Sequence, residues 1–140
     1  YQGIFVPQDI EKAVHYMSLA SDQNLPEALY DLGVFYYDRK YTEVDIDKAI
    51  HYFTLAEDQK FPDAQFVLGI IYYEGIYVPQ NAAKSFHYFT IAANLNNYCA
   101  QYYLGFIYYD GKLTKRDINK SIYYLLLLTL SESNFSNGTI

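Results

Sequence analysis

Apolar residues recur along this chain at the spacing of an α-helix, and the whole pattern returns at a constant interval of 36 residues. One stripe of apolar side chains consists of Ala28, Leu32, Phe35 and Tyr36, and the following stripe of Ala49, Tyr52, Phe53 and Ala56. Separations of one, three and four residues place the members of each stripe on one face of a helix. The pattern therefore predicts two amphipathic helices in every 36-residue unit.

Identical residues mark the 36-residue interval as well as similar ones. They include Lys12, Lys48, Lys84 and Lys120; Tyr16, Tyr52, Tyr88 and Tyr124; and the pairs Leu32-Gly33, Leu68-Gly69 and Leu104-Gly105. Chance does not keep so many identities in register, and a fixed period of this length is typical of repeat proteins. We expect the first helix of a unit over about 26–38, 62–74 and 98–110, and the second over about 9–22, 45–58, 81–94 and 117–130.

Residues at the expected helix ends support these boundaries. An Asp or Asn side chain can accept the unpaired N–H groups of a first helical turn. We expect such N-caps at Asp9, Asp45, Asn81 and Asp117. Gly75 and Gly111 are predicted to end first helices in the left-handed conformation. The short turns that lead to the next first helix carry Asn24, Lys60 and Asn96.

A single pair of such helices cannot bury its apolar faces alone, whereas stacked pairs bury them continuously. Small residues that recur with the repeat, such as Ala28 and Gly33, leave room for a neighbouring helix at about 8–10 Å between axes. The predicted fold is all-α: a right-handed α-solenoid of antiparallel helix pairs with seven helices. We expect the array over 1–130, with a partial first repeat, two full repeats and a partial last repeat, and a polar tail over 131–140.

The composition indicates a folded domain and argues against several kinds of partner. Hydrophobic residues make up 51% of the chain, and its 18 Tyr residues imply many half-buried side chains. The net charge of −6 argues against nucleic acid, which needs clustered positive charge. No apolar run reaches the roughly 18–20 residues of a membrane span. The first residue is Tyr and no signal peptide is visible, so we expect a fragment of a longer protein.

The best copies of the pattern are the string A-x-x-x-L-G-x-x-Y over 28–36 and 64–72, followed after a loop by D-x-x-K-A-x-x-Y-x-x-x-A over 45–56 and 81–92. Asn81 replaces the Asp in the second of these copies, and Ser85 and Ser121 replace the Ala after Lys. This pattern resembles the Sel1-like repeat, a relative of the tetratricopeptide repeat. The resemblance implies a non-catalytic scaffold or adaptor for protein–protein interaction. A cysteine-rich branch of that family carries a disulfide in every repeat, and the lone Cys99 excludes this branch. The family favours Gly in the short turns, where Lys60 adopts the left-handed conformation less easily than Asn.

In such solenoids the first helix of each repeat usually lines the concave face, so the resemblance implies a groove along 26–38, 62–74 and 98–110. The partner-binding residues expected there are Tyr30, Tyr37, Phe66, Tyr73, Tyr102 and Tyr109, with the acidic Asp31, Glu74 and Asp110. Aromatic anchors with few charges are typical of interface cores. The residues between them, which we expect to pack inside the fold, are Val34, Ile70 and Phe106.

The three groove segments contain no Lys or Arg. A groove that clamps a partner's terminal carboxylate needs such side chains. We therefore expect a different partner, a protein or peptide that is apolar with basic flanks.

The sequence offers no catalytic, cofactor-binding or metal-binding set of residues. His15, His51 and His87 recur with the repeat, which separates neighbours by about 10 Å, whereas zinc holds an imidazole nitrogen at about 2.1 Å. Cys99 has no His, Lys or Arg adjacent in sequence that would activate its thiol. Phosphate loops, nucleophile elbows and calcium loops are also missing from the sequence. We therefore expect no enzyme activity and no cofactor.

Two other functions stay open beside the scaffold. The chain is alternatively the regulatory repeat segment of a larger signalling enzyme such as a kinase, or a quality-control adaptor in the endoplasmic-reticulum lumen, where a glycan at Asn119 would support it. The cytoplasm is the favoured compartment, with the lumen as the alternative.

The C-terminal helix carries an apolar residue where earlier repeats are polar. Leu126 replaces Ser18, Thr54 and Thr90. A terminal repeat should turn a polar face to water. We therefore expect a further repeat, a partner or self-association at this helix, or else that 131–140 folds back over it.

Overall fold

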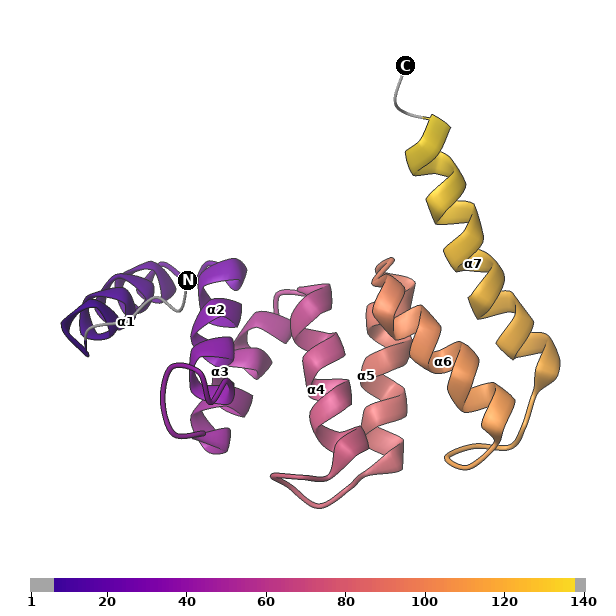
Figure 1. The fold of residues 1–140 in the computed structure, drawn as a ribbon, viewed down its shortest axis with the longest axis horizontal. Coiled ribbons are helices and arrows are strands. Elements are labelled where there is room, and N and C mark those ends of the chain that lie inside the picture. The colour runs from indigo at the N-terminus through magenta and orange to yellow at the C-terminus, as the bar shows by residue number, and fades with distance from the viewer. Residues whose placement is uncertain (1–6, 138–140) are drawn as a thin grey trace. The chain divides into compact units, whose positions relative to one another are not determined.

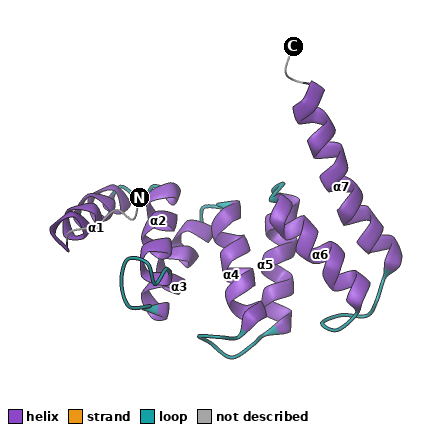
Figure 2. Cartoon of the chain, viewed as in Figure 1, coloured by secondary structure: helices purple, strands orange, loops and turns teal. Residues whose placement is uncertain are grey.

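The computed structural model describes residues 7–137, with side chains over 9–130. Over these residues the chain forms seven α-helices and no strand (Figure 1, Figure 2). The helices are α1 (Pro7–Asp22), α2 (Pro26–Tyr37), α3 (Ile46–Glu57), α4 (Pro62–Glu74), α5 (Ala82–Asn94), α6 (Tyr98–Asp110) and α7 (Ile118–Asn137). The all-α fold and its succession of helices are confirmed.

Two helix ends differ from the prediction. The first helix begins at Pro7, so Asp9 lies within its first turn and is not its N-cap. A proline suits a first helical position because its missing N–H would have no partner there. The last helix continues to Asn137 and does not end near 130, because neither Pro nor Gly occurs between Ile118 and Asn137.

The other predicted N-caps are confirmed by hydrogen bonds. In each case the Oδ1 atom of the capping residue accepts a hydrogen bond from the backbone N–H three residues later. The N–O distances are 3.1 Å from Lys48 to Asp45, 2.9 Å from Lys84 to Asn81 and 3.0 Å from Lys120 to Asp117. Asn97 caps α6 in the same way and was not predicted. Local chemistry therefore fixes where most of these helices begin.

The described residues fall into two compact units, one up to Ala64 and the other from Gln65. In the first unit α2 packs against both α1 and α3. In the second unit α6 packs against both α5 and α7. The candidate surfaces described below each lie within one unit.

Within the units, a glycine lets the two helices of a repeat approach closely. A Cβ atom added at Gly33 would lie 2.5 Å from the ring of Phe53, and one at Gly69 would lie 2.6 Å from the ring of Phe89. Both rings are fully buried. The Leu-Gly pairs of the sequence are thus explained, because only glycine leaves space for the ring.

A stack of two tyrosines and a lysine recurs at the loop end of each repeat. The rings of Tyr36 and Tyr52 lie nearly parallel, with centroids 5.8 Å apart and an angle of 5°, and the Nζ atom of Lys48 lies 4.9 Å from the ring centre of Tyr36. The second unit repeats this arrangement twice, with Lys84 on Tyr72 and Tyr88 and with Lys120 on Tyr108 and Tyr124. Cation–π attraction and ring stacking explain why Lys and Tyr recur together.

Among the residues that the structure describes, five have a left-handed backbone, as the turn pattern predicted. They are Asn24, Lys60 and Asn96 in the short turns, with φ of 57°, 59° and 64°, and Gly75 and Gly111 after α4 and α6, with φ of 65° and 69°. This conformation costs a side chain such as that of Lys about 1–2 kcal/mol, and Asn less. Lys60 is therefore the strained member of the set.

We expect the substitution Gly69→Ala to lower the free energy of unfolding by about 1–3 kcal/mol, because the new Cβ would overlap the ring of Phe89. Urea unfolding followed by circular dichroism measures the change. In a Phe89→Val background, which lacks the overlapping ring atoms, the same substitution should be neutral or stabilising, since Ala favours helix over Gly by about 0.5–1 kcal/mol. An equal loss in both backgrounds would contradict the contact.

We expect Lys60→Gly to raise the free energy of unfolding by about 0.5–1 kcal/mol, because Gly relieves the left-handed strain at a smaller entropic cost. The matched change Asn24→Gly should be close to neutral, since Asn tolerates this conformation. Paired urea titrations of the two variants test the difference. A Lys60→Gly variant less stable than the unmodified chain would refute it.

Candidate functional site

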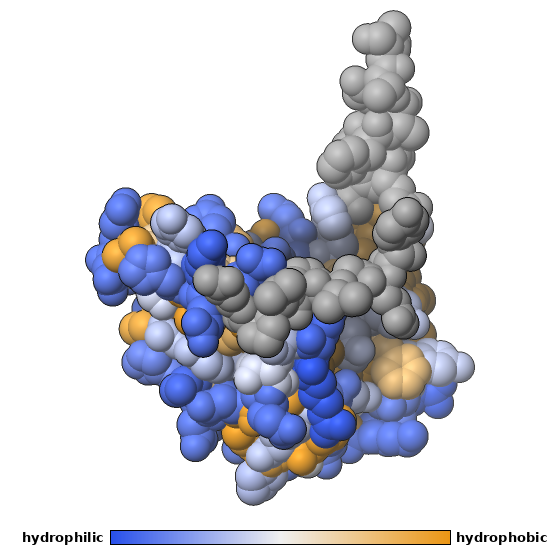
Figure 3. Space-filling view, turned by 60° about the vertical axis from the view of Figure 1, so that its left-hand side comes forward, coloured by the Kyte–Doolittle hydropathy of each residue, from blue (hydrophilic) through white to orange (hydrophobic). Residues whose placement is uncertain are grey.

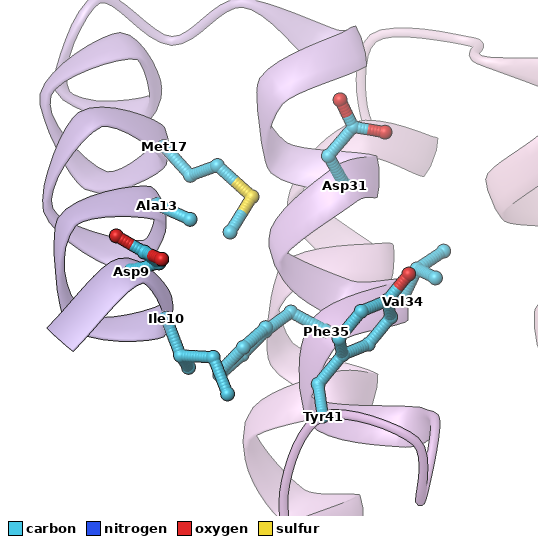
Figure 4. A pocket seen from close by; sticks show the side chains of 8 residues that line it. All are labelled: Asp9, Ile10, Ala13, Met17, Asp31, Val34, Phe35 and Tyr41. Atoms are coloured by element: carbon cyan, nitrogen blue, oxygen red, sulfur yellow. The ribbon is translucent and has the colours of Figure 1, made fainter. Parts of the chain in front are cut away.

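The first unit contains an apolar pocket between α1 and α2, with a volume of about 340 Å³ (Figure 4). Its lining residues are Asp9, Ile10, Ala13 and Met17 of α1, Asp31, Val34 and Phe35 of α2, and Tyr41 of the following loop. In Figure 4 the thioether of Met17 and the ring of Phe35 reach into the space between the two helices. The side chains thus form an apolar cavity with two carboxylates among its lining.

The electrostatics of this pocket favour a positive charge. Asp9 on α1 and Asp31 on α2 supply carboxylates, and no Lys or Arg lines the space. Burial raises the pKa of the Asp31 carboxyl above its ordinary value, and the nearby charge of Glu27 raises it further. A cationic group bound beside Asp31 would relieve both effects.

Met17 of this pocket stands 36 residues before Phe53, whose fully buried ring lies against Gly33. Met17 itself is half-buried and lines the pocket. Sequence reasoning did not predict this site.

The two predicted aromatic residues of the first unit lie on another side of α2. Tyr30 is half-buried and contacts Phe53 and Phe61, at 5.7 and 5.4 Å between ring centroids. Tyr37 is also half-buried, and its ring centroid lies 6.3 Å from that of Phe53. Tyr30 and Tyr37 therefore face α3, whereas Asp31 lines the pocket beside α1.

Phe66 and Tyr73 of the second unit pack around Tyr103 of α6. Their ring centroids each lie 5.7 Å from that of Tyr103, and Phe89 of α5 lies 5.1 Å from it. Burial raises the pKa of the Tyr103 hydroxyl, and the charge of Glu74 contributes next. The next repeat thus covers much of the surface that we expected Phe66 and Tyr73 to offer.

The aromatic stripe of α6, the first helix of its repeat, is exposed. Tyr102 and Tyr109 are each 56% exposed, and Phe106 between them is 44% exposed although we expected it to pack inside. Asp110 is half-buried, and its Oδ1 accepts the backbone N–H of Lys112 at 2.9 Å. On α7, Leu126 is also exposed, as its position in the repeat suggested.

The nine predicted binding residues therefore fall into three groups. Tyr30, Tyr37, Phe66 and Tyr73 are half-buried, and Tyr102 and Tyr109 are exposed. Of the acidic residues, Asp31 and Glu74 are exposed and Asp110 is half-buried. Partner binding by these residues stays a prediction.

The histidines and the cysteine lie apart from these surfaces. His15, His51 and His87 are exposed and pack edge-on against the tyrosine that follows each of them. Cys99 is exposed at the start of α6. Within residues 7–137 no three His, Cys, Asp or Glu side chains gather as a metal site would require. None of the helices in the described part of the chain is both long enough and apolar enough to span a membrane.

A family model for the Sel1 repeat matches the chain four times, over residues 1–25, 26–61, 62–97 and 100–128. These matches cover most of the sequence and follow the 36-residue interval. No curated protein sequence matches the chain.

Solved structures of similar fold are Sel1 repeat proteins and their relatives. The protective antigen c5321 of uropathogenic Escherichia coli, which displays an SLR fold, has a TM-score of 0.81 and 25% identity over 87% of this chain and 26% of its own. A Sel1 repeat protein from Oxalobacter formigenes has a TM-score of 0.79 and 26% identity, over 86% of this chain and 49% of its own. This chain thus spans about a quarter of the first protein and about half of the second.

Cysteine-rich protein B of Helicobacter pylori shares the fold over 99% of both chains, with a TM-score of 0.71 and 22% identity. This chain has a single cysteine, so the similarity concerns the helical arrangement alone.

We expect Asp31→Asn to raise the thermal midpoint of unfolding at pH 7 by a small amount, equivalent to less than about 1 kcal/mol for so exposed a charge. A raised carboxyl pKa means that the folded state favours the protonated form, so its stabilising effect is present at low pH and is lost as pH rises through the folded pKa. Thermal scans at pH 7 and at about pH 3 should show the gain at pH 7 only. The same gain at both pH values would contradict the cause assigned to the shift.

Proposed function

Because the chain belongs to the Sel1 repeat family, we propose that it is a non-catalytic scaffold whose acidic, tyrosine-rich surfaces bind another protein. Members of this family are generally protein-interaction scaffolds, which supports the class of function. The partner segment is apolar and flanked by basic residues. It is a protein or peptide and not a nucleic acid.

The pocket between α1 and α2 is the observation that carries this proposal. Its walls are apolar, its volume of about 340 Å³ suits one large side chain, and Asp9 and Asp31 supply the only charges of its lining. An apolar side chain of the partner fills the space, and a neighbouring Lys or Arg meets the carboxylates. Charge complementarity of this kind sets specificity and association rate more than affinity.

The described surface of the chain is mostly hydrophilic, which is compatible with recognition through charge. On the face shown in Figure 3 hydrophilic residues predominate, and hydrophobic residues form separate small patches. Several basic side chains lie over tyrosine rings at the loop ends, among them Lys48, Lys84 and Lys120. Lys48 and Lys120 also lie 3.4 and 3.9 Å from the carboxylates of Asp45 and Asp117, so these basic charges are engaged within their own repeats. Asp9 and Asp31 of the pocket lining are the carboxylates that would meet a basic partner.

The remaining predicted residues extend this surface within each unit. In the first unit Tyr30 and Tyr37 contribute half-buried rings. Burial raises the pKa of the Tyr30 hydroxyl, and the nearby charges of Asp63 and Asp31 raise it further. In the second unit Phe66, Tyr73, Tyr102 and Tyr109 form the aromatic part of the surface, with Glu74 and Asp110 as its acidic residues.

The proposal is tested with two helical peptides that share one leucine stripe and carry either Lys or Glu on both flanks. Fluorescence anisotropy with the full chain should give an affinity about ten-fold higher for the Lys peptide, because several exposed charge pairs of about 0.2–1 kcal/mol act together. The preference should decrease at 0.5 M salt, at which exposed charges are screened within about 4 Å. Equal binding of the two peptides would overturn the proposal.

A charge-matched pair of variants locates the effect. Asp9→Asn with Asp31→Asn should remove most of the preference for the Lys peptide. Asp22→Asn with Asp58→Asn changes the net charge equally at exposed positions outside the pocket and should keep the preference. An equal loss in both variants would show that net charge, and not the pocket, selects the peptide.

A further inference from the structure

The loop between α6 and α7 concentrates positive charge in an otherwise acidic chain. Residues 112–120 contain one acidic residue, Asp117, and four basic ones: Lys112, Lys115, Arg116 and Lys120. The whole chain has 16 Asp and Glu residues for 10 Lys and Arg. All four basic side chains are exposed, and Figure 2 shows the loop, in teal, extending beyond the end of α6. The charge of this segment is therefore opposite to that of the chain as a whole.

The two ends of the loop lie close together, which gathers its basic residues at one place. A Cβ atom added at Gly111 would lie 2.8 Å from the Cβ atom of Arg116 and 3.2 Å from its backbone nitrogen. Lys112 follows Gly111 directly, and Lys115 directly precedes Arg116. Three basic residues thus come from adjoining positions of one tight loop within a single repeat. We name Lys112, Lys115 and Arg116 the basic loop.

The fold of the repeat does not require these charges. The three described loops that join the two helices of a repeat close with the same backbone hydrogen bond, at 2.9 Å. The N–H of the residue that caps the second helix donates it to the carbonyl of a tyrosine nine residues earlier. At the repeat position of Lys115 the earlier loops carry Glu43 and Pro79. Since the loops close equally well with a negative or an uncharged residue there, packing and capping do not explain the basic loop.

The acidic residues beside the basic loop are engaged in holding its backbone. The Oδ1 atom of Asp110 accepts the backbone N–H of Lys112 at 2.9 Å, and that of Asp117 accepts the backbone N–H of Lys120 at 3.0 Å. The second carboxylate oxygen of Asp117 lies 3.9 Å from the Nζ atom of Lys120. These two carboxylates therefore fix the loop and cap α7, and the field around the basic loop stays positive.

Arg116 is held in a position that suits a carboxylate ligand. Its guanidinium carbon lies 5.3 Å from the ring centre of Tyr109, in the same repeat. A guanidinium that stacks on a ring keeps the N–H groups along its edge available, and two of them can bind the two oxygens of one carboxylate. The ring also restricts the side chain before any ligand arrives, so less conformational entropy is lost on binding.

The size and charge of the basic loop favour a short acidic segment over an extended polyanion. Three basic residues within five positions can meet two or three carboxylates. A DNA duplex or an anionic membrane would extend beyond the loop and meet a chain whose remaining residues are strongly acidic. A peptide segment with adjoining Asp or Glu residues fits the loop without that repulsion.

We propose that the basic loop binds an acidic segment of another protein, with one carboxylate on the Arg116 guanidinium and adjoining carboxylates on Lys112 and Lys115. This inference goes beyond the proposed function, because it adds a second site with the opposite charge preference in the other unit of the chain. With both sites, the chain joins a basic partner segment to an acidic one.

The test uses two fluorescein-labelled peptides, hexaglutamate and hexaglutamine, with the full chain at about 50 mM salt. Fluorescence anisotropy should give saturable binding of hexaglutamate and at least ten-fold weaker binding of hexaglutamine. The affinity for hexaglutamate should decrease several-fold at 0.5 M salt, at which exposed charges are screened within about 4 Å. Equal binding of the two peptides would overturn the proposal.

A charge-matched pair of variants locates the contact. The first neutralises the basic loop: Lys112→Gln, Lys115→Gln and Arg116→Gln. It should weaken hexaglutamate binding at least ten-fold while the urea midpoint changes little, because the three side chains are exposed. The control removes the same charge from exposed positions of the first unit and should keep most of the affinity: Lys12→Gln, Arg39→Gln and Lys40→Gln. An equal loss in both variants would attribute binding to net charge and overturn the proposal.

A conservative change tests the contact assigned to Arg116. Arg116→Lys keeps the charge but removes the planar pair of N–H donors, so hexaglutamate binding should weaken about three-fold. Unaltered binding in this variant would contradict the bidentate contact.

Other occupants of the basic loop give different results. Tighter binding of duplex DNA or of phosphatidylserine vesicles than of hexaglutamate would assign the loop to a polyanion and overturn the proposal. Light scattering of the chain alone tests a second copy. Self-association that is lost when the basic loop is neutralised would assign the loop to that copy and also overturn the proposal.

This inference and the proposed function fail separately. The Asp9→Asn, Asp31→Asn variant should bind hexaglutamate normally, and neutralising the basic loop should leave the preference for the Lys peptide intact. Absence of hexaglutamate binding with the Lys-peptide preference present refutes this inference alone, whereas the reverse result refutes the proposed function alone.

Discussion

The approach of two helices at a glycine is the contact on which the rest of each repeat depends. Without a Cβ at Gly33 or Gly69, the ring of Phe53 or Phe89 lies directly against the backbone of the first helix and is completely buried. This fixes the distance within the pair, and it brings the tyrosines at the loop end into register for stacking. A side chain at either glycine would separate the helices and expose the ring, so a single atom position determines both the core and the surface around it.

The features that could be predicted from the sequence are those decided by local chemistry. Asp45 and Asn81 cap helices through their own neighbours, and Gly75 adopts a conformation that its missing side chain allows. These local signals were easier to recognise because each of them recurs at the 36-residue interval. Helix boundaries over most of the chain were accordingly predicted within one or two residues.

The features that could not be predicted depend on whether a neighbouring helix is present. Phe66 and Tyr102 have the same place in the repeat, yet α6 covers the first and no described helix covers the second. The repeat pattern predicts the role of each position within a repeat. The exposed fraction of a side chain depends in addition on whether a helix of a neighbouring repeat packs against it.

The stack of Lys48 on Tyr36 and Tyr52 has a consequence for how such proteins change over time. All three side chains belong to one repeat, so the interaction that closes the loop end needs nothing from its neighbours. A gene segment that encodes one repeat can therefore be duplicated or lost without breaking the stacks on either side. The number of repeats becomes a quantity that unequal recombination can adjust.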